Sequence, residues 1–470
     1  MIRTLQSDSG STQALCEMIN VRDIARLVQT CTAWARWISE DNSRLVIQSI
    51  KITSRKVDSF AHCGWIQRSL RSLIFIEMTR RHPATFNTLL PLLPRLVRLK
   101  SLQVITSLRA LNGQLFEESF GALSSSLLVL DVHFIAYCTV DVAPMLSAVS
   151  LLTNLETLVI RGCRLCEIDL SSLLSLTKLT RLATGNRSDR CDPAQVLMLS
   201  RMVSLTDLDF GAWLPSLSGS LQLTDSGKAE LEQGLGTLVR LRQENGAAPL
   251  HRLYLGSQVQ VHRESWRVLS QLRELEEIKA FWSREITADE WMLLAQFQQL
   301  RSLKMSPMEL EPLTQPQTHR AMLDLKPVFS ALQHCCALRE LSLRRYLELR
   351  AADVALLARP PALEKFSGDY LRIESLAPLA AAPALLVLSL QNCTGILGES
   401  VNMREMIPPL PLLTCLTITD QVESRLTESE AAPFNAALLL RLPRLSQFVG
   451  NLIQADSSED ELSESDDDEG

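Results

Sequence analysis

The sequence predicts an α/β fold, an irregular curved solenoid in which short parallel strands alternate with helical or irregular return segments. Leucine supplies 87 of the 470 residues, whereas Phe, Trp and Tyr together supply 5%. This bias favours stacked repeats over aromatic-rich cores. The second observation is an apolar spacing that recurs along the chain, and the third is the helical apolar spacing of the segments between its recurrences. Without these repeats, the length alone would predict two or three ordinary domains.

The recurring unit places leucine at position i and apolar residues at i+3 and i+5. It is clearest in NLETLVIRGC, which starts one residue before Leu155, and in ALLVLSLQNC, which starts one residue before Leu385. Both continue to a cysteine at i+8, Cys163 and Cys393. This spacing is the L-x-x-L-x-L-x-x-N/C signature of a leucine-rich repeat.

With small residues allowed at i+3 and i+5, fifteen units are found, and most starts are 22 to 29 residues apart. The starts are Ile47, Leu70, Leu99, Leu127, Leu155, Leu179, Leu205, Leu250, Leu275, Leu300, Leu338, Leu363, Leu385, Leu413 and Leu445. Asn or Cys occupies i+8 only twice, so we expect irregular curvature. No unit can bury its leucines alone, so the fold requires stacking of neighbours.

The segments between units predict the returns. Residues 143–152, 192–202 and 288–300 have helical apolar spacing. Two long gaps indicate insertions near 211–249 and 306–334. The first contains residues 224–241, whose leucines recur on one helical face, and the second is a proline-rich loop followed by a helix around 327–332.

Residues 14–45 follow a different rule and predict a small helical module. Their string D-I-x-x-L-V-x-T-C-x-x-W resembles the second half of an F-box, although the Leu-Pro pair that opens most F-boxes is absent. The resemblance implies that the module docks a cullin-adaptor subunit of a ubiquitin ligase through Ile24, Leu27, Val28, Cys31 and Trp34. Alternatively, these helices only cap the hydrophobic end of the solenoid, which every repeat array requires.

Strand geometry predicts where a protein partner binds. If i+3 and i+5 face the core, then i+2, i+4 and i+6 project from the concave face of the sheet. In the units from Leu250 to Leu338 these positions form an aromatic and basic strip, the composition of protein-binding hot spots. The predicted partner-binding residues are Arg252, Tyr254, Lys279, Phe281, Lys304 and Arg344.

Motifs of catalysis and metal binding are not found in the sequence. Cys163 and Cys166 form a single CxxC without the second pair that a zinc site needs. The seven histidines form no HExxH motif, and no phosphate-binding glycine loop or G-x-S-x-G is present. We therefore expect no enzyme activity, no cofactor and no metal. Basic residues are scattered in phase with the repeats, which makes a nucleic-acid partner the less favoured reading.

The net charge of −6 conceals an asymmetry, because residues 456–470 hold nine carboxylates and no base. The preceding residues therefore carry a net +3. Such a block cannot bury enough apolar surface to offset its ordering entropy, so we expect a disordered acidic tail after a solenoid spanning 46–455, and a flexible segment at 1–13. Four serines in the tail have an acidic residue at +3 and are phosphorylation candidates: Ser457, Ser458, Ser463 and Ser465.

These observations lead to one functional hypothesis and two alternatives. The chain is predicted to be a non-enzymatic substrate receptor of a cullin-type ubiquitin ligase. It could instead be a leucine-rich-repeat scaffold without a ubiquitin role, or a GTPase regulator or acidic nuclear leucine-rich protein. The eleven cysteines have no disulfide spacing, and neither a signal peptide nor a membrane span is predicted. We therefore expect a cytoplasmic or nuclear protein without a membrane partner.

Overall fold

A computed structural model describes the chain in two compact units, Met1–Ile286 with Met308–Leu310, and Thr287–Pro307 with Glu311–Gly470. The described residues are 50–53, 70–76, 85–106, 113–138, 143–163, 170–185, 198–209, 225–255, 260–261, 263–282, 286–307, 325–393, 408–419 and 440–450.

The first unit contains a parallel sheet whose strands pair in chain order. Its strands are β1 (Ile50–Thr53), β2 (Ser72–Ile76), β3 (Ser101–Thr106), β4 (Val129–Cys138), β5 (Thr157–Cys163), β6 (Arg181–Gly185), β7 (Asp207–Asp209), β8 (Arg252–Tyr254) and β10 (Glu277–Trp282). A short extra strand, β9 (Gln260–Val261), pairs with β10.

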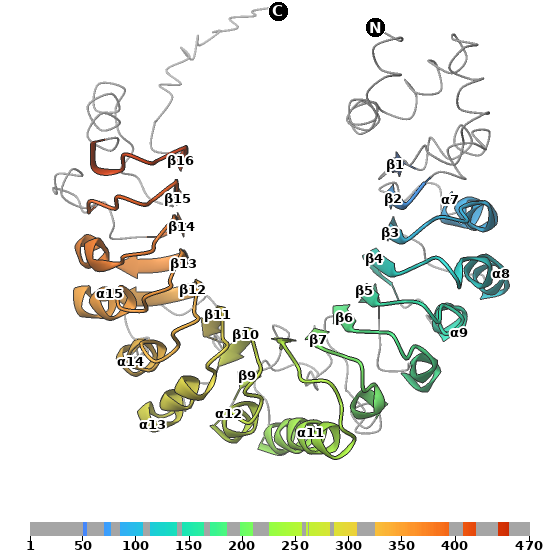
Figure 1. Cartoon of the computed structure of the whole chain (residues 1–470), viewed down its shortest axis with the longest axis horizontal. Helices are drawn as coiled ribbons and strands as arrows, with labels where there is room; N and C mark the ends of the chain where they lie inside the picture. Colours follow the sequence, from blue (N-terminus) through green and yellow to red (C-terminus); the bar gives the residue numbers. More distant parts are fainter. Residues whose placement is uncertain are drawn as a thin grey trace, which may run out of the picture. The chain divides into compact units, whose positions relative to one another are not determined.

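Helices connect these strands and lie on one face of the sheet (Figure 1). They are α7 (Thr85–Leu89), η2 (Leu90–Arg95), α8 (Gly113–Leu123), α9 (Ala143–Val149), η3 (Leu170–Ser175), α11 (Asp225–Glu244) and α12 (Arg263–Leu269). A column of tilted rings joins Phe75, Phe86, Phe116 and Phe120, with successive centroids 5.3 to 5.8 Å apart, in the core of the early repeats.

The second unit repeats this plan. Its parallel strands are β11 (Ser302–Pro307), β12 (Glu340–Leu349), β13 (Lys365–Ile373), β14 (Val387–Gln391), β15 (Cys415–Thr419) and β16 (Gln447–Gly450). Its helices are α13 (Ala288–Trp291), η4 (Met292–Gln296), α14 (Lys326–Leu332), α15 (Ala351–Leu357) and η6 (Ala377–Ala381), and they too lie on one face of the sheet (Figure 1).

The predicted period matches the strands. Each of the fifteen predicted starts is followed by one strand, and residues at the same repeat position are register partners. Leu130, Leu158 and Leu182 show this, because they are all i+3 residues and lie opposite one another on β4, β5 and β6. From Leu70 to Leu413 the starting leucines are at most 2% exposed. Burying each leucine contributes about 1.5–3 kcal/mol, so the stacked repeats form the core.

The predicted return helices are also observed where the structure describes them. α9 and α13 with η4 lie within two of the predicted segments, and α14 corresponds to the helix expected around 327–332. In the third predicted segment, residues 198–201 are helical. The first long gap contains the 20-residue α11, which buries Leu235 and Leu238. The leucine-rich-repeat fold is therefore confirmed.

Other predictions fall outside the described residues. These are the F-box-like module at 14–45, the segment 1–13, the proline-rich loop and the acidic tail with its four serines. No helix in the described part of the chain is both long enough and apolar enough to cross a bilayer.

Two irregular positions show how the repeats tolerate deviation. Gly368 occupies an i+5 core position, and the side chain of Leu371 fills the space that a larger residue would take, because a Cβ built at Gly368 would lie 2.6 Å from its Cδ1. Gly162 has φ = +80°, and a Cβ there would overlap the carbonyl oxygen of Phe134 on β4. The register between β4 and β5 shifts just beyond this point.

We predict that Gly162→Ala lowers the free energy of unfolding by about 3 kcal/mol or more, because it combines left-handed backbone strain with a clash against main chain. Gly246→Ala is the matched control: its φ is +60°, but nothing lies within 4 Å of the added Cβ. The control should cost about 1 kcal/mol. Urea denaturation measures both, and equal losses would show that the close approach to Phe134 has no energetic effect.

Arg242 fastens the end of α11 to the neighbouring repeat. Its side chain is 4% exposed and donates hydrogen bonds to the carbonyl oxygens of Met202 (3.2 Å), Leu205 (2.5 Å) and Ala248 (2.7 Å). Burial lowers the pKa of Arg242 to about 10, so the guanidinium remains charged at neutral pH. Arg242 thus joins the segment just before β7 to the segment just after α11.

Replacing Arg242 by Met should lower the free energy of unfolding by about 2–3 kcal/mol, since the three carbonyls lose their charged donor. Arg240→Met, on the same helix, removes only an exposed i,i+4 ion pair with Glu244 and should change it by less than about 0.5 kcal/mol. Thermal and urea denaturation of the two variants tests the contrast. A similar small loss in both would contradict the role given to Arg242.

Candidate functional site: the open face of the sheet

The face of each sheet opposite the helices, here called the open face, carries the residues at i+2, i+4 and i+6. Register places each set in a row that runs across the strands. On β4 and β5, for example, His133 and Arg161 are partners in the i+6 row, and both are exposed. The core positions i+3 and i+5 lie between these rows and are buried. The exposed members of the rows form the surface available to a ligand within each unit, whereas Val159, Ala183 and Ser342 in the i+4 row are buried.

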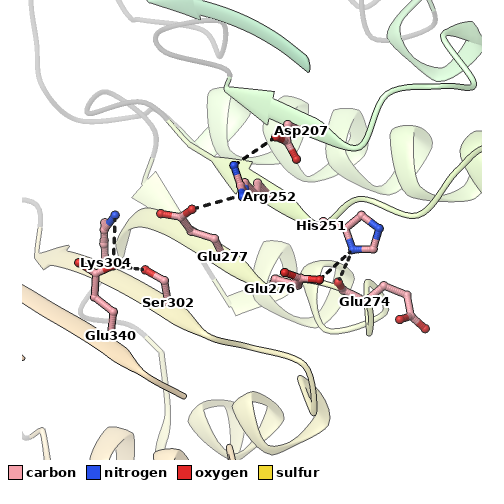
Figure 2. Close-up of polar contacts among 9 residues, drawn as sticks. All are labelled: Asp207, His251, Arg252, Glu274, Glu276, Glu277, Ser302, Lys304 and Glu340. Atoms are coloured by element: carbon pink, nitrogen blue, oxygen red, sulfur yellow. Dashed lines mark hydrogen bonds and ion pairs between the residues drawn. The ribbon is translucent and has the colours of Figure 1, made fainter. Parts of the chain in front are cut away.

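In the first unit the i+2 row becomes a ladder of alternating charge. Arg181, Asp207, Arg252 and Glu277 are successive register partners on β6, β7, β8 and β10. The guanidinium of Arg252 lies 3.5 Å from the Asp207 carboxylate and 3.8 Å from that of Glu277 (Figure 2). Its side chain is 49% exposed, so these pairs orient it more than they stabilise the fold. The charge of Arg252 is thus largely compensated within the sheet.

Tyr254 and Lys279 are neighbours in the i+4 row. The Lys279 Nζ lies 5.8 Å from the centroid of the Tyr254 ring, within the range of a cation–π contact. Burial raises the pKa of Tyr254, and its hydrogen bond to Glu277 raises it further. Tyr254 is therefore held as a neutral phenol with its ring partly exposed. Lys279 is exposed, and no carboxylate is paired with it among the described residues.

His251 lies directly before β8 and contacts the next repeat. Its Nδ1 lies 3.3 Å from the carbonyl oxygen of Glu274 and 3.6 Å from the carboxylate of Glu276 (Figure 2). Both groups are acceptors, so Nδ1 carries a proton in this arrangement.

In the second unit the open face has one compensated cluster centred on Glu340. Its carboxylate lies 3.7 Å from Lys304 Nζ and accepts a hydrogen bond from Ser302 at 3.2 Å (Figure 2). It also lies 2.9 Å from Lys365 Nζ. Burial raises the pKa of Glu340, but the lysines and Ser302 outweigh it, so the pKa is lower than normal. Both cations thus share one anion.

Beyond this cluster the open face of the second unit is polar with few charges. Its i+4 row continues as hydroxyl residues in register, namely Ser342, Ser367, Ser389 and Thr417. Arg344 lies in the i+6 row opposite Asp369 and is exposed.

A further carboxylate on the open face is partly desolvated. Asp131 on β4 accepts a hydrogen bond from Gln103 at 3.2 Å. Burial raises its pKa, and the favourable charges of Arg161, His133 and Arg181 do not fully offset that effect. Asp131, His133, Arg161 and Arg181 thus form a group of charged and titratable side chains on the open face of β4 to β6.

The predicted partner-binding residues take the repeat positions expected of them. Arg252, Tyr254 and Lys279 adjoin one another in the first unit, while Lys304 and Arg344 lie on neighbouring strands of the second. Phe281 lies on β10, but its side chain is outside the described residues. Sequence reasoning missed the compensation of charge by Glu277 and Lys365. Reading the i+2 residues down successive units, which alternate in sign from Arg181 to Glu277, would have revealed it.

Possible metal ligands and the buried cysteines are the other groups that could carry chemistry. Among the described residues no cluster of three or more His, Cys, Asp or Glu side chains could hold a metal ion. Cys335 is buried, and burial raises its pKa to about 12, which keeps the thiol protonated. Cys393, at the i+8 position, is also buried and donates to the carbonyl of Gln391 at 3.3 Å, which is a structural role. The side chain of Cys163 is outside the described residues.

No protein family and no curated protein matches the sequence. Among solved structures, the chain is similar to TLR13 in a complex with single-stranded RNA, with 16% identity and a TM-score of 0.42 over 87% of this chain and 55% of that one. This chain thus spans about half of the TLR13 chain.

Two bacterial proteins are also similar to this chain. An internalin of Listeria monocytogenes gives 15% identity and a TM-score of 0.34, covering 87% of this chain and 88% of its own. A leucine-rich-repeat protein of Leptospira interrogans gives 13% and 0.38, covering 85% and 99%.

We predict that Glu340→Gln lowers the free energy of unfolding by about 1 kcal/mol at pH 7, because two lysines lose their shared anion. The pKa of Glu340 is below its unfolded value of 4.5, so the stabilisation is complete above that pH. It is lost as the pH falls through the lower folded value, and the two proteins should then converge. Glu364→Gln, which removes a more exposed pair with Arg339, is the control and should have a smaller effect at every pH. A gap that persists in acid would contradict this assignment.

Proposed function

We propose that this protein is a non-enzymatic protein-interaction module that holds its partner on the open face of the repeats. The observation that carries the proposal is the pair of Tyr254 and Lys279, a partly exposed aromatic ring beneath an exposed cation on a rigid strand pair. Tyrosine is one of the residues enriched in protein-binding hot spots. Because the neighbouring Arg252 is already paired with Asp207 and Glu277 while Lys279 is not, we infer a partner with both apolar and acidic groups rather than a simple polyanion.

The finer proposal is that the protein is a substrate receptor of a cullin-type ubiquitin ligase in the cytoplasm or nucleus. It rests on the F-box-like string in residues 14–45 and on its position directly before the repeats. In this arrangement Leu27 and Trp34 pack on the adaptor, and the open face presents the substrate. The alternatives are a scaffold with no ubiquitin role, in which residues 14–45 only cap the repeats, and a GTPase regulator or acidic nuclear leucine-rich protein.

Affinity purification from cells with two double variants tests both levels of the proposal. Leu27→Ala with Trp34→Ala should remove the adaptor and cullin but keep the other partners. Tyr254→Ala with Lys279→Glu should keep the adaptor and deplete the other partners about tenfold, as expected when a hot-spot pair is lost.

Arg201→Glu is the control for the second variant, because Arg201 is exposed and lies outside the open-face rows. An unchanged adaptor signal in the first variant would reject the ubiquitin role. An unchanged partner set in the second would reject this face as the binding surface.

A further inference from the structure

Four exposed cations without a side-chain partner among the described residues lie close together at one edge of the first sheet, away from the open-face ladder. Arg71, Arg95, Arg98 and Lys100, here called the basic edge, are all exposed, and in the described part of the chain none of the four side chains has an ion pair or hydrogen bond. Residues 70–76 and 85–106 contain no Asp or Glu. The basic edge therefore differs from the ladder, where Arg252 lies between two carboxylates.

Local structure places these four residues together. The amides of Lys100 and Ser101 donate to the carbonyl of Arg71 at 2.7 and 3.0 Å, which sets Arg71 beside Lys100 just before β2 and β3. Arg95 ends η2, and Arg98 lies in the turn that follows it. Val97 between them is 59% exposed. The amino-terminal edge of two adjacent strands thus presents four cations around one aliphatic side chain.

The sequence strengthens this contrast. Residues 51–106 contain ten Lys or Arg and two Asp or Glu, a net charge of +8, whereas all residues before the acidic tail together carry +3. Positive charge is therefore concentrated in the first repeats. Residues 456–470 carry nine carboxylates, with Leu462 among them. Residues 51–106 and residues 456–470 therefore carry large net charges of opposite sign.

We propose that the acidic segment 456–470 binds the basic edge. Charge complementarity is the main reason: an unpaired polycation and a polyanion in one protein attract each other, and the attraction is screened by salt over about 10 Å at 0.1 M. The four cations have no competing partner in the described chain, whereas Arg252, Lys304 and Lys365 on the open face already have carboxylates. Glu117 and Glu118 on the following helix are engaged with Ser147 and Gln114.

A nucleic-acid partner fits this edge less well. Single strands are bound by basic grooves that also offer exposed aromatic rings for stacking. The phenylalanine rings that the structure describes in these repeats, Phe75, Phe86 and Phe116, are at most 1% exposed. The edge therefore offers charge and an aliphatic contact, which suits a carboxylate-rich segment that contains leucine.

Zero-length carbodiimide cross-linking of the full chain at low salt tests the proposal, because it joins lysine amines only to carboxylates in contact. Lys100 is the one lysine of the basic edge. We expect it to be the main lysine linked to residues 456–470, with a yield that falls steeply between 20 and about 300 mM salt. Arg71→Glu with Arg98→Glu should reduce this link about tenfold.

Arg201→Glu with Arg273→Glu is the matched control, since both residues are exposed and the change in net charge is the same. It should leave the Lys100 link unchanged. Links spread evenly over the lysines, links mainly to Lys279 or Lys304, or an equal loss in the control would overturn the proposal. So would a single-stranded RNA that binds the basic edge more tightly than a peptide of residues 456–470 and displaces the link.

Discussion

The stacking of leucines in register is the interaction on which everything else in this protein depends. No repeat has enough apolar surface to form a core alone, so each strand must align with its neighbour at the same repeat position. Once Leu158 lies opposite Leu130 and Leu182, the residues on the other face of the strands are aligned as well. A one-residue slip would move the leucines into solvent, so the register is strongly determined. The geometry of the surface is therefore set by the core.

This alignment explains how charges in the i+2 row come to be compensated. Arg252 has carboxylates on both sides because its row alternates in sign, and Glu340 has Lys365 beside it in the same row, with Lys304 within reach from the adjacent strand. In a parallel sheet the neighbours are about 4.8 Å apart, so like charges in one row would repel. A partner on this face contacts oriented side chains and experiences only a weak electrostatic field. The strand edges have no such constraint, and Arg71 and Lys100 lie side by side there without a carboxylate partner among the described residues.

Departures from the repeat are accommodated locally, by neighbouring side chains that fill space or donate hydrogen bonds. At Gly368 a core position has lost its side chain, and Leu371 fills it from the same strand. At Gly162 the backbone comes so close to β4 that only glycine fits. Around α11, Arg242 donates to carbonyls on both sides of the long insertion. Each device is local, so neighbouring repeats keep their register.

The sequence by itself determined the fold class, the phase of the repeats and the face on which each residue lies. Leucine spacing and strand alternation are local properties that recur in every unit, so Leu70 and Leu413 could be placed without knowing their neighbours. Only the tertiary structure decided which charges are paired, because the partner of Arg252 depends on register across two strands and that of Lys365 on side-chain reach. It likewise revealed the contacts of Arg242, which join residues about 40 positions apart. Distances of this kind are not encoded in any short motif, since they arise only when the repeats have stacked.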